Sequence, residues 1–206
     1  MLIPLSTLVA KYDLKIENVL HLGAHTCEEL DDYLHFGANN IHWIEANKKL
    51  YRKQKSRLDK KINRITCAVV SDIDGQKVDF KITSSSQSSS ILKLKQHLIS
   101  HPEIYEIKSQ KRKTITIDTL IKDSNLKKEI DFFNLDIQGA ELLALKGATE
   151  TLPRVKGIFT EVNIKEMYEG CALIHEIDDF LKTFGFVRLE KKLFGNAGWG
   201  DAFYMK

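Results

Sequence analysis

Residues 19–29 read VLHLGAHTCEE, and this stretch sets the expected fold. Val19–Gly23 is a short apolar run rich in strand-forming residues, and the next segment, Cys27–Phe36, has apolar residues at helical spacing. The stretch therefore predicts a buried strand, a tight turn and a helix. The same unit follows at once, because the apolar run Ile41–Ile44 precedes a helix-forming segment at Asn47–Leu58.

The alternation of strand and helix continues further along the chain. Ile62–Val70 predicts a third strand, and Ile130–Asp136 predicts a fourth, followed by a helix from Ala140 to about Leu152 and a strand at Gly157–Val162. Short apolar runs that alternate with helices predict βαβ units, in which helices cover both faces of a parallel sheet.

The pattern differs in an insertion or extension at about residues 76–117. Lys77–Thr83 alternates polar and apolar residues like an exposed edge strand, and Lys113–Ile117 predicts another strand. Between them, Leu92–Glu106 predicts a helix that is broken near Pro102. We expect these elements to lie beside the main sheet.

The C-terminal part predicts a closing antiparallel hairpin. A helix is expected at Ile174–Phe184, and the runs Phe186–Lys191 and Gly200–Met205 are joined by the glycine-bearing segment Phe194–Trp199 without an intervening helix. No repeat or linker interrupts the chain, so residues 1–206 are expected to form one domain.

Composition places the chain among ordinary globular proteins. It has 206 residues, 43% of them hydrophobic and 29% charged, with a formal net charge of +3. This charge is too small to indicate a nucleic-acid partner. The three widely separated cysteines, Cys27, Cys67 and Cys171, favour a reducing compartment. We therefore expect a cytoplasmic protein with neither a signal peptide nor a membrane span.

The residues that follow each strand are the candidates for ligand binding, because ligands of open α/β sheets bind at the carboxyl ends of the strands. Gly23 follows the first strand, and Glu45 follows the second, 22 residues later. This spacing is typical of a glycine beside a nucleoside cofactor and an acidic residue that accepts hydrogen bonds from its ribose. The alternative is a structural turn glycine and a solvated glutamate.

The loop after the first strand also bears on which cofactor is bound. A dinucleotide needs several glycines so that backbone amides can hold its pyrophosphate, and this loop has one. S-adenosylmethionine has the ribose and adenine without a phosphate, so the loop favours it. A nicotinamide-dependent oxidoreductase remains as an alternative.

Eight segments resemble, in order and spacing, the FkbM family of S-adenosylmethionine-dependent methyltransferases. They are VLHLGAHTCEE, IHWIEAN, AVVSDIDG, SSSIL, ITIDTL, FFNLDIQGAELLALKGA, FTEVN and WGDAFYMK. The resemblance implies a class I methyltransferase fold: a Rossmann-like α/β domain with a seven-stranded, mostly parallel sheet and a C-terminal antiparallel hairpin. It also implies O-methylation of a hydroxyl on a sugar, glycan or similar metabolite. The chain departs from the family at Cys27, where a second glycine is frequent, and at Gln138, where Glu is frequent.

The resemblance also implies a set of cofactor contacts. Gly23, Ala24 and His25 would lie along the methionine moiety, and Glu45 would hold the ribose with Ala46 and Asn47 beside it. The remaining expected contacts are Ala68 and Val69 near the adenine, and Asp136 and Gln138 near the transferable methyl group.

Catalysis requires a group that helps to remove the proton of an alcohol, which is a poor nucleophile at neutral pH. Asp136 and Glu161 end neighbouring strands in this interpretation, so either is a candidate base, as is His25. With Gln138 or Asn163, the two carboxylates also form a candidate site for Mg²⁺ or a similar hard cation. The structural alternatives are that Asp136 caps the following helix, that Glu161 pairs with a lysine, and that His25 bonds backbone.

Acceptor recognition is expected from three further elements. The Ser84–Ser90 segment is either a flexible loop or a lid, with Ser89 and Ser90 nearest the ligand. Asn163 lies beyond Glu161, and in the final hairpin Trp199 would stack on a sugar whose hydroxyls bond Asp201, unless these two are a core tryptophan and a turn aspartate. The acceptor would be a small molecule or a glycan.

Three histidines and one basic segment complete the candidates. His97 and His101 are expected at a surface helix end, and His21 in the core. Nine Lys or Arg residues and one acid, Asp59, lie between Lys48 and Arg64. This segment is either a solvated helix face or a docking patch for an anionic glycan, phosphate or membrane surface. A catalytically silent methyltransferase-fold module that binds a partner through this face is a further alternative.

Overall fold

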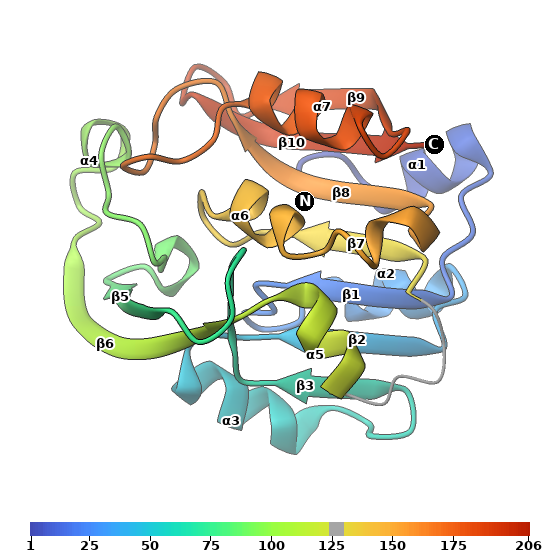
Figure 1. The fold of residues 1–206 in the computed structure, drawn as a ribbon, viewed down its shortest axis with the longest axis horizontal. Coiled ribbons are helices and arrows are strands. Elements are labelled where there is room, and N and C mark those ends of the chain that lie inside the picture. Colours follow the sequence, from blue (N-terminus) through green and yellow to red (C-terminus); the bar gives the residue numbers. More distant parts are fainter. Residues whose placement is uncertain (124–129) are drawn as a thin grey trace.

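A computed structural model describes residues 1–123 and 130–206. Its centre is a seven-stranded sheet with the strand order β3-β2-β1-β7-β8-β10-β9 (Figure 1). The first five of these strands are parallel, and β10 is antiparallel to both of its neighbours. The predicted fold class and C-terminal hairpin are thus confirmed. The bounds are β1 Asn18–Leu22, β2 Asn40–Ile44, β3 Asn63–Thr66, β7 Phe132–Leu135, β8 Gly157–Asn163, β9 Val187–Leu193 and β10 Trp199–Met205.

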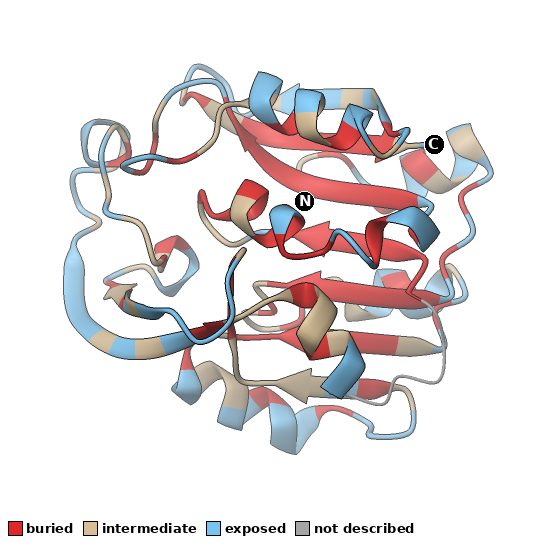
Figure 2. Cartoon of the chain, viewed as in Figure 1, coloured by how far each residue is buried: buried red, intermediate tan, exposed pale blue. Residues whose placement is uncertain are grey.

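Helices cover both faces of this sheet because its central strands are apolar on both sides. Leu20 and Leu22 of β1 pack toward α5, α6 and α7, whereas Val19 packs with α1 and α2 on the opposite face. Strands β1, β2, β7, β8 and β10 are almost fully buried, whereas the edge strand β9 and the helices expose their outer sides (Figure 2). These helices are α1 Leu5–Tyr12, α2 Leu30–His35, α5 Ile117–Asp123, α6 Glu141–Lys146 and α7 Ile174–Lys182. The sequence interpretation missed α1 and α5.

A second, three-stranded sheet lies beyond the carboxyl ends of the main strands (Figure 1). It has the order β4-β6-β5, with β4 Val69–Val70, β5 Lys77–Thr83 and β6 Glu106–Ile115. The expectation of one strand over Ile62–Val70 is therefore wrong: the chain leaves the main sheet after Thr66, and Val69 pairs with Thr114 of β6. A short helical turn, η1 Ser86–Ser88, follows β5.

The helix expected over Leu92–Glu106 is reduced to α4, His97–Ser100. Leu94 forms an isolated bridge with Tyr168, and the Lys95 amide donates to the Met167 carbonyl at 2.9 Å. Pairing with this distant loop satisfies backbone groups that a helix would otherwise have used. The segment consequently forms part of the wall around the carboxyl ends of the strands.

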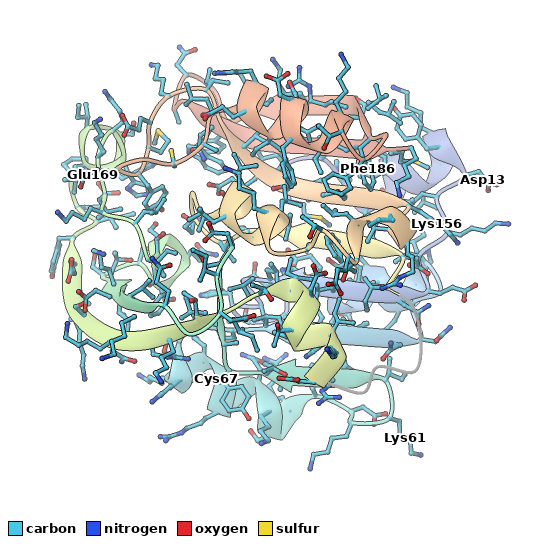
Figure 3. The ribbon with its side chains drawn as sticks, in the orientation of Figure 1. Asp13, Lys61, Cys67, Lys156, Glu169 and Phe186 are labelled. Carbon is cyan, nitrogen blue, oxygen red and sulfur yellow. The ribbon has the colours of Figure 1, made fainter. Side chains whose placement is uncertain are left out.

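Helix α3, Lys48–Arg57, carries most of the basic segment. All nine Lys and Arg side chains between Lys48 and Arg64 are exposed, as expected of a solvated helix face, and Lys61 extends away from the fold (Figure 3). The helix expected from Ala140 to about Leu152 is shorter than predicted, because α6 ends at Lys146 and a separate turn, η2 Leu152–Arg154, follows. Within the described ranges, no helix is long and apolar enough to cross a membrane.

Candidate active site

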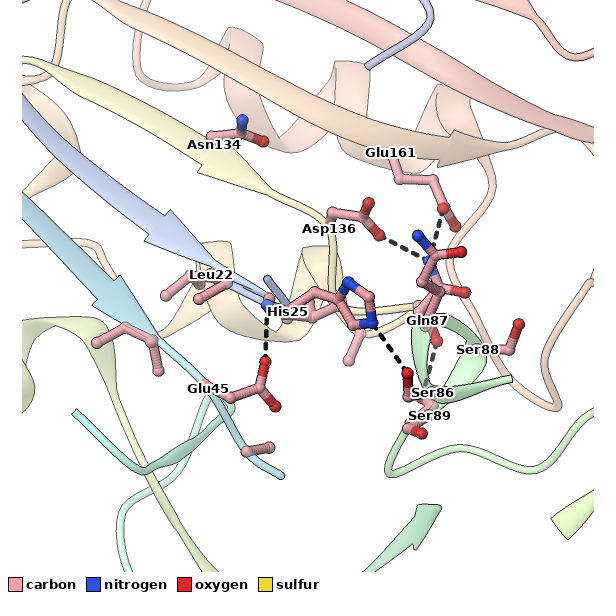
Figure 4. A pocket seen from close by; sticks show the side chains of 18 of the residues that line it. Leu22, His25, Glu45, Ser86, Gln87, Ser88, Ser89, Asn134, Asp136 and Glu161 are labelled. Atoms are coloured by element: carbon pink, nitrogen blue, oxygen red, sulfur yellow. Dashed lines mark hydrogen bonds between the residues drawn. The ribbon is translucent and has the colours of Figure 1, made fainter. Parts of the chain in front are cut away.

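A cavity of about 410 Å³ opens at the carboxyl ends of β1, β2 and β7, between the main sheet and the segment around η1 (Figure 4). Nearly all of the predicted site residues line it: Gly23, Ala24, His25, Glu45, Ala46, Ala68, Val69, Ser89, Ser90, Asp136, Gln138, Glu161, Asn163, Trp199 and Asp201. Asn47 does not line the cavity. Its side chain instead accepts a hydrogen bond from the Lys49 amide at 3.0 Å and caps α3.

The loop after β1 is fixed between two neighbouring strands. Gly23 has φ +87°, and a Cβ on it would lie 1.8 Å from the carbonyl oxygen of Asp136. The amides of Gly23 and Ala24 both donate to the Ile44 carbonyl at 3.0 Å. Position 23 therefore requires a glycine, because the Asp136 backbone leaves no room for a side chain. This contact holds the start of the loop after β1 against the end of β7.

The rest of this loop turns through left-handed backbone conformations. His25 has φ +41° and Cys27 has φ +56°. A glycine, which the resemblance to the family implies at this position, would adopt the Cys27 conformation without strain. The turn directs the His25 ring toward η1, where its Nε2 lies 2.9 Å from Ser86 Oγ (Figure 4). The loop after β1 and the serine segment thus meet across the cavity.

Glu45 is a buried carboxylate held by backbone amides. The His25 amide donates to Oε2 at 2.8 Å and the Asn47 amide to Oε1 at 2.6 Å. Burial raises the pKa of Glu45 to about 7, although these amides and the Arg112 guanidinium act in the opposite direction. A carboxylate has about four acceptor positions, so Glu45 retains capacity for the hydroxyl groups of a ligand.

Gln138 bridges the two carboxylates predicted for catalysis. Its Nε2 donates to Asp136 Oδ1 at 2.6 Å and to Glu161 Oε2 at 2.9 Å. The Tyr168 hydroxyl donates to Gln138 Oε1 at 2.5 Å. Because the carbonyl end of the amide is occupied by this hydroxyl, the amino end faces the carboxylates. Glu at position 138 would place a third negative charge here, so Gln changes the electrostatics of the site.

Asp136 and Glu161 lie in an acidic environment. Asp136 opens onto the cavity, yet the protein around it desolvates the carboxyl group and raises its pKa. Glu161 is 6% exposed, and burial raises its pKa well above the usual range, with added repulsion from Asp136, Glu141 and Asp201. In the part of the chain that the structure describes, Glu161 has no lysine partner. Among these residues the structure does not support the lysine-pair alternative.

The loop after β7 is organised by Glu141. Its Oε1 accepts hydrogen bonds from the Ile137 amide at 3.0 Å and the Gly139 amide at 3.1 Å. Glu141 is buried, which raises its pKa to about 7. This carboxylate, one position into α6, satisfies the free amides before the helix, and α6 has no side-chain cap from Asp136. Asp136 is therefore free to face the cavity.

The serine segment forms the opposite wall of the cavity. Ser90 Oγ donates to the Gln138 carbonyl at 2.7 Å, and its backbone pairs with Lys81. Ser89 Oγ accepts from the Thr83 amide at 3.3 Å. These contacts tie the segment to β5 and to the loop after β7. Its role as a lid stays a prediction.

The histidines are placed differently from one another. His21 is buried, with Nδ1 3.0 Å from the Tyr33 hydroxyl, which confirms the expected core position. The surface position expected for His97 is wrong, because this residue is 7% exposed, lines the cavity and lies with its ring 5.5 Å from that of Tyr168. The bridge between Leu94 and Tyr168 brings α4 to the cavity.

Several cavity residues were missed from the sequence. Tyr168 and Met167 come from the loop after β8, and Ser86 and His97 come from the segment after β5. Of these, only Ser86 carried a signal, because it lies in the Ser84–Ser90 segment. Glu141 does not line the cavity, but it also carried a signal, because it follows Asp136 by five residues in the most family-specific segment. Within residues 1–123 and 130–206, no group of three or more His, Cys, Asp or Glu is placed to hold a metal ion. The magnesium site stays a prediction.

The profile of the methyltransferase FkbM domain matches residues 20–188. The chain belongs to the FkbM methyltransferase family. A similar protein is the 2-O-methyltransferase NoeI of Sinorhizobium fredii, which is 32% identical over 100 residues, covering 48% of this chain and 41% of NoeI. The chain thus spans about two fifths of the length of NoeI.

Solved structures share the fold of this FkbM-family chain. The methyltransferase FkbM from Methylobacillus flagellatus has a TM-score of 0.57 at 12% identity, with 93% of this chain and 44% of that chain covered. Magnesium protoporphyrin IX methyltransferase from Synechocystis with bound SAM has a TM-score of 0.53 at 9% identity, with 98% and 75% covered. The family and fold confirm S-adenosylmethionine as the cofactor class expected from the sequence.

Proposed function

We propose that this chain transfers a methyl group from S-adenosyl-L-methionine to a hydroxyl group of a sugar, a glycan or a similar metabolite. One observation carries the proposal: Glu45, held by two amides, opens onto the same cavity as the Asp136–Gln138–Glu161 group. A ribose-binding carboxylate and a candidate base thus lie in one continuous space. The named activity of NoeI, 2-O-methylation, supports transfer to oxygen.

The residues present fit this cofactor. Glu45 has free acceptor positions for two ribose hydroxyls, and the apolar side chains of Ala68 and Val69 line the same cavity for the adenine. The Asp136 carboxylate, which lines the same cavity, suits a ligand that carries a sulfonium group. When bound, S-adenosylmethionine supplies an electrophilic methyl group at its sulfonium centre.

Asp136 is the base in this proposal. Its desolvated carboxylate has a raised pKa, which makes it a better proton acceptor for an alcohol than an ordinary aspartate. Gln138 Nε2 donates to Asp136 Oδ1, so the other carboxylate oxygen of Asp136 is available for the acceptor hydroxyl. The proton would move from the hydroxyl to this carboxylate as the methyl carbon exchanges its bond to the sulfonium sulfur for a bond to the hydroxyl oxygen, with S-adenosylhomocysteine as the leaving group. His25 lines the same cavity and is the second candidate base.

Positioning supplies the rest of the rate enhancement. A displacement at carbon requires the attacking oxygen, the methyl group and the sulfur to be nearly collinear. The close contact between Gly23 and Asp136 sets the separation of the cofactor loop and the base, because the two segments are in backbone contact. Their relative position does not depend on flexible side chains.

The experiment is methyl transfer from tritiated S-adenosylmethionine to a panel of mono- and oligosaccharides, with wild-type protein, Asp136→Asn and His25→Ala. We expect label in a sugar, a loss of about 100-fold or more with Asp136→Asn, and a smaller loss with His25→Ala. Parallel reactions with EDTA test the metal. Full activity of Asp136→Asn would remove Asp136 as the base, and labelling of amine groups alone would remove transfer to oxygen.

A further inference from the structure

Four polar or aromatic side chains form one patch where β8 and β10 pair. Glu161 is the register partner of Asp201, and Asn163 is the register partner of Trp199. Residues two apart on a strand point to the same face, and directly opposed residues do so as well. All four line the cavity. We call Glu161, Asn163, Trp199 and Asp201 the β8–β10 quartet.

The polar members of the quartet offer acceptors to the cavity. Asn163 is 1% exposed, and its Oδ1 has no hydrogen-bond partner. Asp201 accepts a hydrogen bond from the Leu2 amide through Oδ2, and Glu161 accepts from Gln138 through Oε2. A buried acceptor without a donor is costly, so the unpartnered Asn163 oxygen indicates a ligand donor at this position.

Acidic side chains dominate the charge around the quartet. Six carboxylates line the cavity, and none of the Lys or Arg side chains in the described ranges does; the carboxylates are Glu28, Glu29, Glu45, Asp136, Glu161 and Asp201. The amino group of Met1 lies close enough to lower the pKa values of Asp136 and Asp201. Burial nevertheless leaves the pKa of Asp201 raised to about 6. A ligand cation would relieve this repulsion, and a ligand anion would add to it.

The fourth member is an aromatic surface. Trp199 stacks on Phe194 with ring centroids 4.9 Å apart and an interplanar angle of 21°. This contact fixes the indole beside the carboxylates. An indole next to hydrogen-bond acceptors is suited to a ligand with an apolar face and polar edges, such as a pyranose ring, and it also attracts a cation.

We propose that the β8–β10 quartet binds the acceptor through a protonated amine next to the hydroxyl that is methylated, as in a sugar with a free amino group. The inference rests on the proposed function and narrows its substrate class. An ammonium group has three donors for Glu161, Asp201 and Asn163 Oδ1. Its lone pair is held by a proton, so it cannot attack the methyl group, and transfer stays on the hydroxyl.

The experiment is calorimetric titration of the full chain, saturated with S-adenosylhomocysteine, with three methyl glycosides that differ in charge. These are the glycosides of glucosamine, N-acetylglucosamine and glucuronic acid. We expect the glucosamine glycoside to bind about tenfold or more tightly than the N-acetyl form, and the glucuronic acid glycoside more weakly than both. Asp201→Asn should remove this preference, whereas Asp179→Asn, a matched change at an exposed position on α7, should retain it.

The outcomes that contradict the amine subsite differ from the outcome that contradicts the proposed function. Equal binding of the glucosamine and N-acetyl glycosides, or no binding of the glucosamine glycoside, overturns the amine subsite. If Asp201→Asn weakens S-adenosylhomocysteine instead of the sugar, the quartet holds the amino group of the cofactor, and the amine subsite is overturned while the proposed function stands. Failure of the wild-type protein to bind S-adenosylhomocysteine overturns the proposed function itself.

Discussion

The carbonyl oxygen of Asp136 occupies the space that a side chain on Gly23 would need, 1.8 Å from the ideal Cβ position. The ends of β1 and β7 are therefore in backbone contact, and the Asp136 amide also donates to the Leu22 carbonyl at 3.0 Å. This contact joins the loop proposed to bind the cofactor to the residue proposed as the base.

Gly23→Ala is predicted to destabilise the fold strongly. The new methyl group would overlap backbone, and φ +87° is strained for alanine, so we expect a loss of about 3 kcal/mol or more. Gly75→Ala is the matched control, because Gly75 has φ +74° but no atom within 4 Å of the added Cβ, and its cost should be ~1–2 kcal/mol. Urea unfolding measures both. Equal losses would show that the Asp136 contact adds nothing.

The affinity for S-adenosylhomocysteine is predicted to rise with pH through neutrality. Glu45 has a pKa of about 7 without ligand, and ribose hydroxyls donate to its ionised form. Binding should therefore lower this pKa and release protons, which strengthens binding as the pH increases from 6 to 8. Calorimetry in buffers of different ionisation enthalpy measures the release. Glu45→Gln should bind more weakly and with a flatter pH dependence; an unchanged pH dependence would contradict the assignment.

Gln138→Leu is predicted to raise the pKa of Asp136 further. The substitution removes the donor that favours the carboxylate form, and desolvation and the neighbouring acids remain. Carboxyl-carbon NMR titration of the protein without ligand measures the shift. Gln87→Leu is the control, because Gln87 lines the same cavity from the η1 segment. A fall in the Asp136 pKa would mean that the bridge does not stabilise the charge.

Asn47→Ala is predicted to lower the stability of the fold without changing the affinity for S-adenosylhomocysteine. Loss of the hydrogen bond to the Lys49 amide should cost about 1 kcal/mol of stability. The backbone amide of residue 47 remains and still donates to Glu45. Affinity for S-adenosylhomocysteine should then be unchanged, as measured by calorimetry beside the unfolding experiment. A tenfold weaker affinity would instead restore Asn47 as a direct cofactor contact.

Local patterns predicted the strand ends well. The apolar runs that became β1, β2, β7 and β8 are short and bounded by polar or glycine residues, and parallel strands bring such ends together regardless of loop detail. Glu45 was therefore placed at this edge of the sheet by its spacing from Gly23, and Asp136 and Glu161 by the expected ends of their strands. The most family-specific segment added Gln138 without indicating that its amide bridges two carboxylates.

Residues brought in by long-range pairing were not predictable in the same way. Tyr168 reaches Gln138 because the loop after β8 pairs with the segment before α4, more than 70 residues earlier in the chain. Neither segment has a periodic pattern that reveals its partner. The same pairing overrides the helix expected over Leu92–Glu106. It also buries His97, which the following Pro102 and the absence of a Glu between His97 and His101 had placed at a surface helix end.

Calorimetric titration of the wild-type chain with S-adenosylhomocysteine and, separately, with NAD tests the proposed cofactor site. We predict saturable binding of S-adenosylhomocysteine at one site, with affinity reduced about tenfold or more by Glu45→Gln, and no saturable binding of NAD. Saturable NAD binding without S-adenosylhomocysteine binding would contradict the proposed cofactor site.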